Sequence, residues 1–194
     1  MVSMITEYHN YIEKNVDDLD SNKRILFGIW CTYNNLNDKK INKFIKRESE
    51  GAIDTSIIKK FLEDLWKSIF TYNENSADLT KYGIHIKDIL NNTPWVHDEI
   101  VSRNPENEHL SWVCILIIGG IENFMDYITA GNIQNLLMCA ESNLNIADYR
   151  SEFGLISNKK ALKDEVDTQI LFINQLRVGA IDLKGINKYS ERFI

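Results

Sequence analysis

Apolar side chains recur at intervals of three and four residues along nearly all of this chain, which is the spacing of one face of an α-helix. The clearest stretch covers residues 57–70, where one helical face would carry Ile57, Ile58, Phe61, Leu62, Leu65, Trp66, Ile69 and Phe70. Asp54 or Thr55 precedes this stretch, and either is a suitable N-terminal cap. The pattern therefore predicts a helix with this face turned toward the core.

The same spacing predicts further helices before and after this one. The first two, over residues 5–19 and 25–36, meet near Asp20 or Ser21, and either residue can cap the second helix, so we expect an antiparallel pair. Other helices are predicted over residues 41–45, 86–90, 95–103, 105–130, 133–147 and 161–176.

Three segments depart from this spacing. Residues 73–82 are polar and lack an apolar period, which predicts the longest loop of the chain. Thr93 and Pro94 fit the cap and the first position of a short helix. Residues 180–194 are mixed but carry spaced apolar side chains, so we expect the tail to dock on the helices.

The most apolar run lies within the helix predicted to begin at Pro105. It covers residues 110–121, which is shorter than the roughly 20 apolar residues that cross a membrane, so we expect a buried helix and no membrane association. Gly119 and Gly120 lie inside it, and glycine in a helix interior costs about 1 kcal/mol relative to alanine. We expect another backbone to approach closely there.

These elements predict an all-α fold, a single domain over residues 1–194 built as a bundle of about seven to nine helices. With 194 residues, 44% hydrophobic and 26% charged, the chain can bury a core without disulfides or metals. Cys31, Cys114 and Cys139 are widely spaced among apolar neighbours, so we expect reduced core thiols. The N-terminal residues show no signal peptide pattern, and we expect a cytoplasmic protein.

The charge balance bears on the class of partner. The formal net charge is −6, from 28 acidic and 22 basic side chains, which disfavours nucleic-acid binding and favours attraction of a basic protein. Nucleotide-binding loops, hydrolase elbows and paired zinc-binding cysteines are not found, and we expect no cofactor.

Two acidic groupings could still support chemistry. Glu106 and His109 have the Glu-x-x-His spacing of carboxylate-bridged metal sites in helical bundles, and Glu122 and Asp126 share a helix face four residues apart. Solvated charge at a helix start explains the first pair, and the wet edge of a buried helix explains the second. A metal-dependent enzyme using all four residues is the alternative to a non-enzymatic protein.

Two segments of the chain carry recognisable motifs: residues 61–67, FLEDLWK, and residues 165–169, EVDTQ, the latter followed by Leu171-Phe172 and Leu176-Arg177. With these motifs the chain resembles the YjaG-like family of small bacterial all-helical proteins, a domain of unknown function. The order of elements is also similar, although Pro94 leads here into Trp95 and not into an alanine-rich helix. The resemblance implies a helical fold and no catalytic residues.

The sequence thus favours a non-enzymatic protein-binding module, such as a bacterial immunity protein that neutralises a cognate toxin by occlusion. Occlusion depends on complementary shape and charge, so no short motif is expected. A structural homodimer is a third hypothesis. The acidic residues predicted to contact a basic toxin domain are Asp17, Asp18, Asp20, Glu63, Asp64, Asp98 and Glu99.

Overall fold

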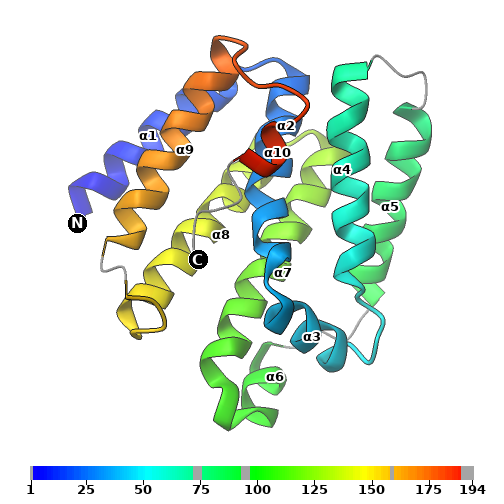
Figure 1. Ribbon diagram of the computed structural model, residues 1–194, viewed down its shortest axis with the longest axis vertical. Coiled ribbons are helices and arrows are strands. Elements are labelled where there is room, and N and C mark those ends of the chain that lie inside the picture. The colour runs from blue at the N-terminus through cyan, green and yellow to red at the C-terminus, as the bar shows by residue number, and fades with distance from the viewer. Residues whose placement is uncertain (1, 72–75, 93–96, 158–159, 189–194) are drawn as a thin grey trace.

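The computed structural model describes residues 2–71, 76–92, 97–157 and 160–188, and all of their regular structure is helical (Figure 1). The prediction of an all-α, multi-helix fold is confirmed. The helices are α1 (Val2–Asp17), α2 (Ser21–Tyr33), α3 (Lys39–Glu48), α4 (Thr55–Thr71), α5 (Ser76–Asn92), α6 (His97–Arg103), α7 (Glu108–Ala130), α8 (Ile133–Glu152), α9 (Ala161–Arg177) and α10 (Gly185–Lys188), with short 3-10 turns η1 (Asn34–Asn37) and η2 (Pro105–Asn107).

The long apolar helix α7 lies at the centre of the molecule. It packs against α8, α5, α2, α3 and α6, and side chains such as Cys114, Ile118 and Phe124 are fully buried. By length and composition alone, residues 105–130 could also cross a membrane. In this fold their apolar side chains contact other helices, as the prediction of a buried helix requires.

The two longest helices, α7 and α8, form an antiparallel hairpin with a two-residue link. Gly131 ends α7 in the left-handed conformation, at φ 70°, and its N–H donates to the carbonyl of Tyr127. The side chain of Asn132 then accepts from the N–H of Gln134 and caps α8. This link fixes the direction of α8, which carries part of the candidate site.

Glycines allow two close approaches to this hairpin. A methyl group on Gly120 would lie 3.1 Å from Cβ of Ser142 in α8, as expected of close packing, whereas one on Gly119 would meet nothing within 4 Å. The expectation is therefore correct for Gly120 and wrong for Gly119. The tightest approach is at Gly28 in α2, where a methyl group would overlap the ring of Phe124.

The predicted loop over residues 73–82 is wrong for most of its length, because α5 begins at Ser76. The buried Ile86 and Leu90 anchor the later turns of α5, and a helix that is already anchored extends at little further cost. Polar residues can therefore be helical without an apolar period of their own. The predicted cap at Thr93 and Pro94 lies outside the described residues.

The C-terminal segment docks on the bundle through residue 186. Ile186 is buried, and the indole N–H of Trp66 in α4 donates to the carbonyl of Leu183 at 3.2 Å. Ile186 is part of a short helix, α10, which contacts α2 (Figure 1). The prediction of a docked tail is confirmed for this part, and residues 189–194 lie outside the described residues.

Candidate functional site

Helix α1 is attached to α9 by polar side chains. The hydrogen bonds that join the two helices include Tyr8 Oη to Gln169 Oε1, Tyr11 Oη to Asn174 Oδ1 at 2.8 Å, and Arg177 Nη1 to Asn15 Oδ1 at 2.7 Å. These bonds hold one side of α1 on α9. Another side of the same helix contacts α8, and the candidate site lies between α1 and α8.

The innermost of these bonds belongs to a buried polar network. Gln169 is fully buried, and its Nε2 donates to Glu165 Oε1 at 2.7 Å and to the carbonyl of Ala140 in α8 at 3.0 Å. The hydroxyl of Tyr8, itself 3% exposed, donates to the amide oxygen of the same glutamine. A buried polar group is costly unless it is bonded, so a network satisfied in this way fixes the position of Tyr8.

A pocket of about 160 Å³ lies between α1 and α8. Its seven lining residues come from one face of each helix: Tyr8, His9, Ile12 and Glu13 from α1, and Gln134, Leu137 and Glu141 from α8. Spacings of three, four and seven residues bring these side chains together because each spacing repeats a helical face. Tyr8 and Ile12 are buried, whereas the polar lining residues reach solvent.

The polar rim of the pocket is negatively charged. Glu13 and Glu141 approach it from the two helices, and none of its described lining residues is a lysine or arginine. Neither glutamate forms an ion pair with another described residue. The rim therefore favours a cation and disfavours a carboxylate or phosphate.

Exposed acidic residues continue from the pocket along α8. Glu141, Asp148 and Glu152, which we call the acidic stripe, lie on the exposed side of the helix and have no ion-pair partner among the described residues. They span 11 residues, or about 17 Å at 1.5 Å per residue. Carboxylates in the last turns of a helix oppose its dipole, so Asp148 and Glu152 do not serve the stability of α8.

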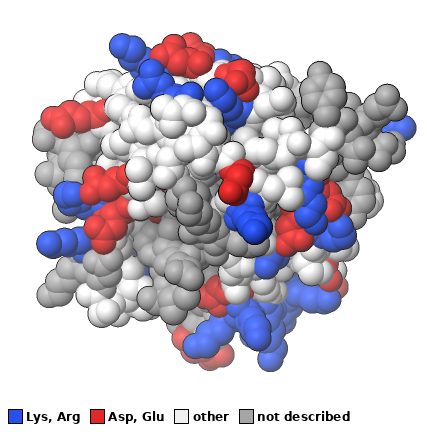
Figure 2. All heavy atoms as spheres, turned by 45° about the horizontal axis from the view of Figure 1, so that its top comes forward, with Lys and Arg blue, Asp and Glu red and all other residues white. Residues whose placement is uncertain are grey.

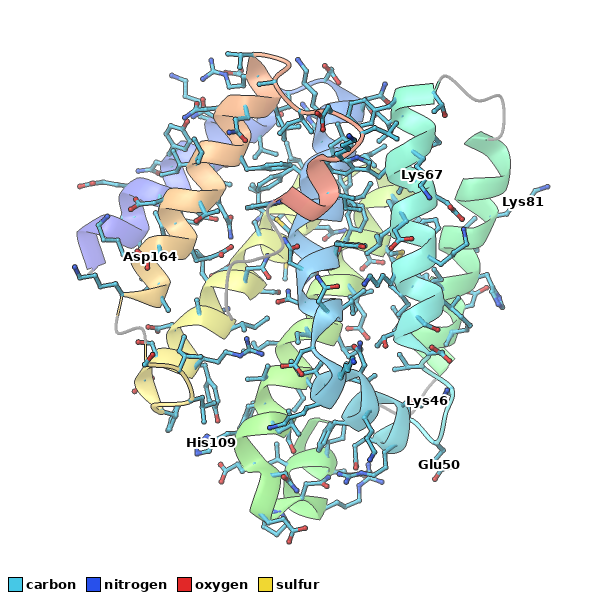
Figure 3. The ribbon with its side chains drawn as sticks, viewed as in Figure 1. Lys46, Glu50, Lys67, Lys81, His109 and Asp164 are labelled. Carbon is cyan, nitrogen blue, oxygen red and sulfur yellow. The ribbon has the colours of Figure 1, made fainter. Side chains whose placement is uncertain are left out.

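An aromatic cluster adjoins the C-terminal end of the stripe. Nδ1 of His109 lies 3.0 Å from the hydroxyl of Tyr149, and Phe153 stacks at a tilt on both rings, with centroid distances of 4.9 and 4.6 Å. Phe153 is 48% exposed although it is apolar. Burial and the nearby Glu108 and Glu152 raise the pKa of Tyr149, so its hydroxyl stays protonated. Figure 3 shows His109 at this end of the molecule.

Most of the acidic residues predicted to bind a partner already have partners within the chain. Their contacts are Asp17 with Arg24 at 3.3 Å, Asp20 with the N–H of Lys23 at 2.9 Å as the cap of α2, Glu63 with the hydroxyl of Tyr33 at 2.8 Å, and Asp64 with Lys60 at 2.7 Å. Asp18 and Glu99 are exposed, and the side chain of Asp98 lies outside the described residues.

These predicted contact residues do not form one surface. The turn between α1 and α2 lies at one end of the molecule and α6 at the other, with α4 along the side (Figure 1). Figure 2 views the first of these ends and shows acidic and basic side chains next to one another there. A single partner surface made of all seven residues is not compatible with this arrangement.

The four residues of the alternative metal site also lie apart. His109 and Glu122 are 13 residues apart in α7, which is about 20 Å along the helix. His109 bonds to Tyr149, whereas Asp126 pairs with Lys87 of α5 at 2.6 Å. Within the described residues no three histidine, cysteine, aspartate or glutamate side chains come together to hold a metal ion. Glu106 is on η2, directly before α7, and so lies at the same end of α7 as His109.

Glu122 and Asp126 form the wet edge of α7. Asp126 is half exposed and neutralised by Lys87, while Glu122 is half buried. Burial, and secondarily the charge of Asp126, raises the pKa of Glu122. The position of Glu122 and Asp126 at the solvent-exposed edge of α7, with Lys87 beside Asp126, thus explains the pair without a bound ligand.

Sequence reasoning did not find the pocket or the acidic stripe. The stripe has a signal, since its members are spaced by seven and four residues with Asn145 and Met138 on the same exposed side. The pocket has none, because it depends on α1 and α8 lying side by side, more than 120 residues apart in the sequence.

Comparison with known proteins assigns no function to the pocket or to the acidic stripe. No protein-family model, curated protein or solved structure matches the chain. The resemblance to the YjaG-like family therefore stays a prediction, and function has to be argued from the site itself.

Proposed function

We propose that this chain is a non-enzymatic protein-binding module that binds a basic partner through the exposed side of α8. The observation that carries the proposal is the acidic stripe, whose three carboxylates have no counterion among the described residues. Carboxylates without an internal partner are available to a positively charged surface and steer its approach.

The aromatic cluster supports the same face. Tyrosine and other large aromatic side chains are enriched in the buried centres of protein interfaces, where they account for much of the binding free energy. Phe153 and Tyr149 adjoin Glu152, so a partner that contacts the stripe would also cover Phe153. Phe153 thus offers exposed apolar area to a partner, next to the charge of Glu152.

A toxin domain is the partner class that we propose. An immunity protein acts by occlusion and needs a complementary surface but no reactive geometry. The net charge of −6 suits a basic target, and the thiols of Cys31, Cys114 and Cys139, which are buried and form no disulfide with one another, suit a reducing cytoplasm. The residues that we now place in the interface are Asp148, Glu152, Tyr149 and Phe153, with Glu141 at the pocket.

Affinity capture with two matched variants tests the proposal. The tagged chain, the variant Asp148→Asn/Glu152→Gln and the variant Asp17→Asn/Asp64→Asn are used as bait in lysate of the native cells, at low and high salt. Both variants change the net charge by the same amount. We expect one basic protein to be captured by the wild type and the second variant, and about tenfold less by the first, because two charge contacts are lost.

Two results would contradict this proposal. Equal capture by both variants would show that Asp148 and Glu152 do not contact the partner. Equal loss with both would show that only the overall charge attracts basic proteins, without a defined interface.

A further inference from the structure

We propose that the pocket between α1 and α8 binds a guanidinium group, supplied by an arginine side chain of the partner. This inference rests on the proposed function, since it assigns one anchor of the same interface. It is carried by four properties of the pocket, namely its size, the charge of its rim, its apolar walls and its rigid floor.

Size selects a small group. The pocket holds about 160 Å³, close to the roughly 150 Å³ of an engineered cavity that takes up benzene, a molecule of six non-hydrogen atoms. The arginine side chain beyond Cβ also has six non-hydrogen atoms. A nucleotide or a peptide strand is too large to be enclosed in this space, whereas a single side chain fits it.

The charge of the rim selects a planar cation. Glu13 and Glu141 approach from the two helices, and Gln134 adds a side-chain amide to the lining. A guanidinium presents five N–H donors in a fixed plane and can reach acceptors on two sides at once, whereas an ammonium is a point charge. Two carboxylates on facing helices therefore match arginine better than lysine.

The walls suit the rest of the arginine side chain. Ile12 and Leu137 offer apolar surface to its methylene groups. The aromatic rings of Tyr8 and His9, whose centroids lie 5.5 Å apart, also line the pocket. The lining thus provides both charge and apolar contact within one small pocket.

The floor of the pocket is preorganised. Tyr8 is held by Gln169, and Gln169 is held in turn by Glu165 and by the carbonyl of Ala140, the residue before Glu141. This network joins α1, α8 and α9 directly beneath the pocket. A ligand would therefore find its binding site already formed, with little ordering cost.

A titration of the isolated chain tests the inference. The probe is N-acetyl-arginine amide, followed by the backbone ¹H–¹⁵N spectrum, with N-acetyl-citrulline amide as the neutral probe of nearly equal shape and N-acetyl-lysine amide as the point-charge probe. We expect saturable shifts at the lining residues of α1 and α8 with the arginine probe, weaker binding of the lysine probe and none of the citrulline probe.

Variants of the rim give the expected change in affinity. Glu13→Gln and Glu141→Gln should each raise the Kd for the arginine probe about tenfold, because each removes one charge-assisted contact. Asp17→Asn, on α1 but outside the pocket and outside the proposed interface, should leave this Kd unchanged. A variant spectrum that keeps the wild-type pattern away from the pocket shows that the fold is intact.

Four results would overturn the inference. Three of them are the absence of saturable shifts, equal shifts with the citrulline probe, and equal Kd values for wild type, Glu13→Gln and Glu141→Gln. Tighter binding of free arginine than of the blocked probe would also overturn it, because the ligand would then be the free amino acid and not a side chain of a protein.

The two proposals fail in distinguishable ways. If Asp148→Asn/Glu152→Gln reduces capture of the partner while Glu13→Gln and Glu141→Gln do not, the protein-binding function stands and the arginine pocket is refuted. If the arginine probe binds as expected but no basic protein is captured, the guanidinium site stands and its assignment to a partner protein is refuted.

Discussion

A single hydrogen atom at Gly28 decides how closely α2 approaches α7. A methyl group there would overlap the ring of Phe124 and come within 2.9 Å of Leu136, and both side chains are fully buried. Gly119 is the natural comparison, because a methyl group at that position in α7 meets nothing within 4 Å. The two glycines have the same chemistry but opposite environments.

We therefore predict opposite effects of the same substitution. Gly28→Ala should lower the free energy of unfolding by about 1–3 kcal/mol, as overpacking of a core does. Gly119→Ala should raise it by up to about 1 kcal/mol, since alanine is the better helix former. Urea denaturation followed by circular dichroism measures both. Equal effects of the two substitutions would contradict the packing described for Gly28.

The half-buried carboxyl group of Glu122 predicts a dependence of stability on pH. Its pKa is raised by burial and by Asp126, so the folded state binds this proton more tightly than the unfolded state. The stabilisation that the proton gives is complete below the ordinary pKa of 4.5 and is lost as the pH rises through the folded-state value.

Glu122→Gln should consequently raise the Tm at neutral pH and have a smaller effect at pH values below the ordinary pKa of 4.5. Thermal unfolding of both proteins across this range checks the expectation, with the exposed Glu106→Gln as the control for loss of one carboxylate. A stabilisation by Glu122→Gln that does not change with pH would mean that titration of this group is not its cause.

At the scale of elements, α1 depends on its polar attachment to α9. Tyr8→Phe leaves one acceptor of the buried Gln169 unsatisfied and should cost about 1 kcal/mol. Gln169→Leu also removes a donor to Glu165 and should cost about 2 kcal/mol or more. Because both substitutions break the same bond, the double variant should cost less than the sum of the two.

A double-mutant cycle by urea denaturation measures this coupling. Tyr11→Phe, which removes the exposed bond to Asn174, is the matched control and should be nearly additive with Gln169→Leu. Additive costs for Tyr8→Phe and Gln169→Leu would show that the buried bond contributes nothing to the attachment of α1.

Helical periodicity predicted the existence and order of most elements. It identified α4 together with its inner face, of which Ile58, Phe61, Leu62, Leu65 and Trp66 are buried, while Ile57 and Phe70 lie at its exposed edges. It also predicted that the long apolar helix ends at residue 130, which is where α7 ends. It missed the first turns of α5, because their helicity follows from neighbouring turns and not from a local apolar pattern.

At the scale of the whole molecule, the candidate site could not be predicted from the sequence. Acidic residues close together in the sequence, such as Asp17 and Asp20, are obvious candidates for a binding surface. In the fold, however, Asp17 pairs with Arg24, and Asp20 pairs with Lys23 and caps α2. The carboxylates without partners, such as Glu141 and Glu152, are spread along α8 and become a surface only when the helix forms. The pairs of Asp17 with Arg24 and Asp20 with Lys23 are local in the sequence, whereas the pocket beside Glu141 forms only when α1 packs on α8, and the sequence pattern does not contain that contact.

The most direct test of the account is a map of backbone hydrogen exchange in the chain, free and bound to the basic protein captured from its native cells. We predict slower exchange on binding in residues 133–153 and 108–112 and in α1 beside the pocket, with little change in α4 and α6. Slower exchange confined to α4, α6 or the turn between α1 and α2 would contradict the proposal that the exposed side of α8 is the interface.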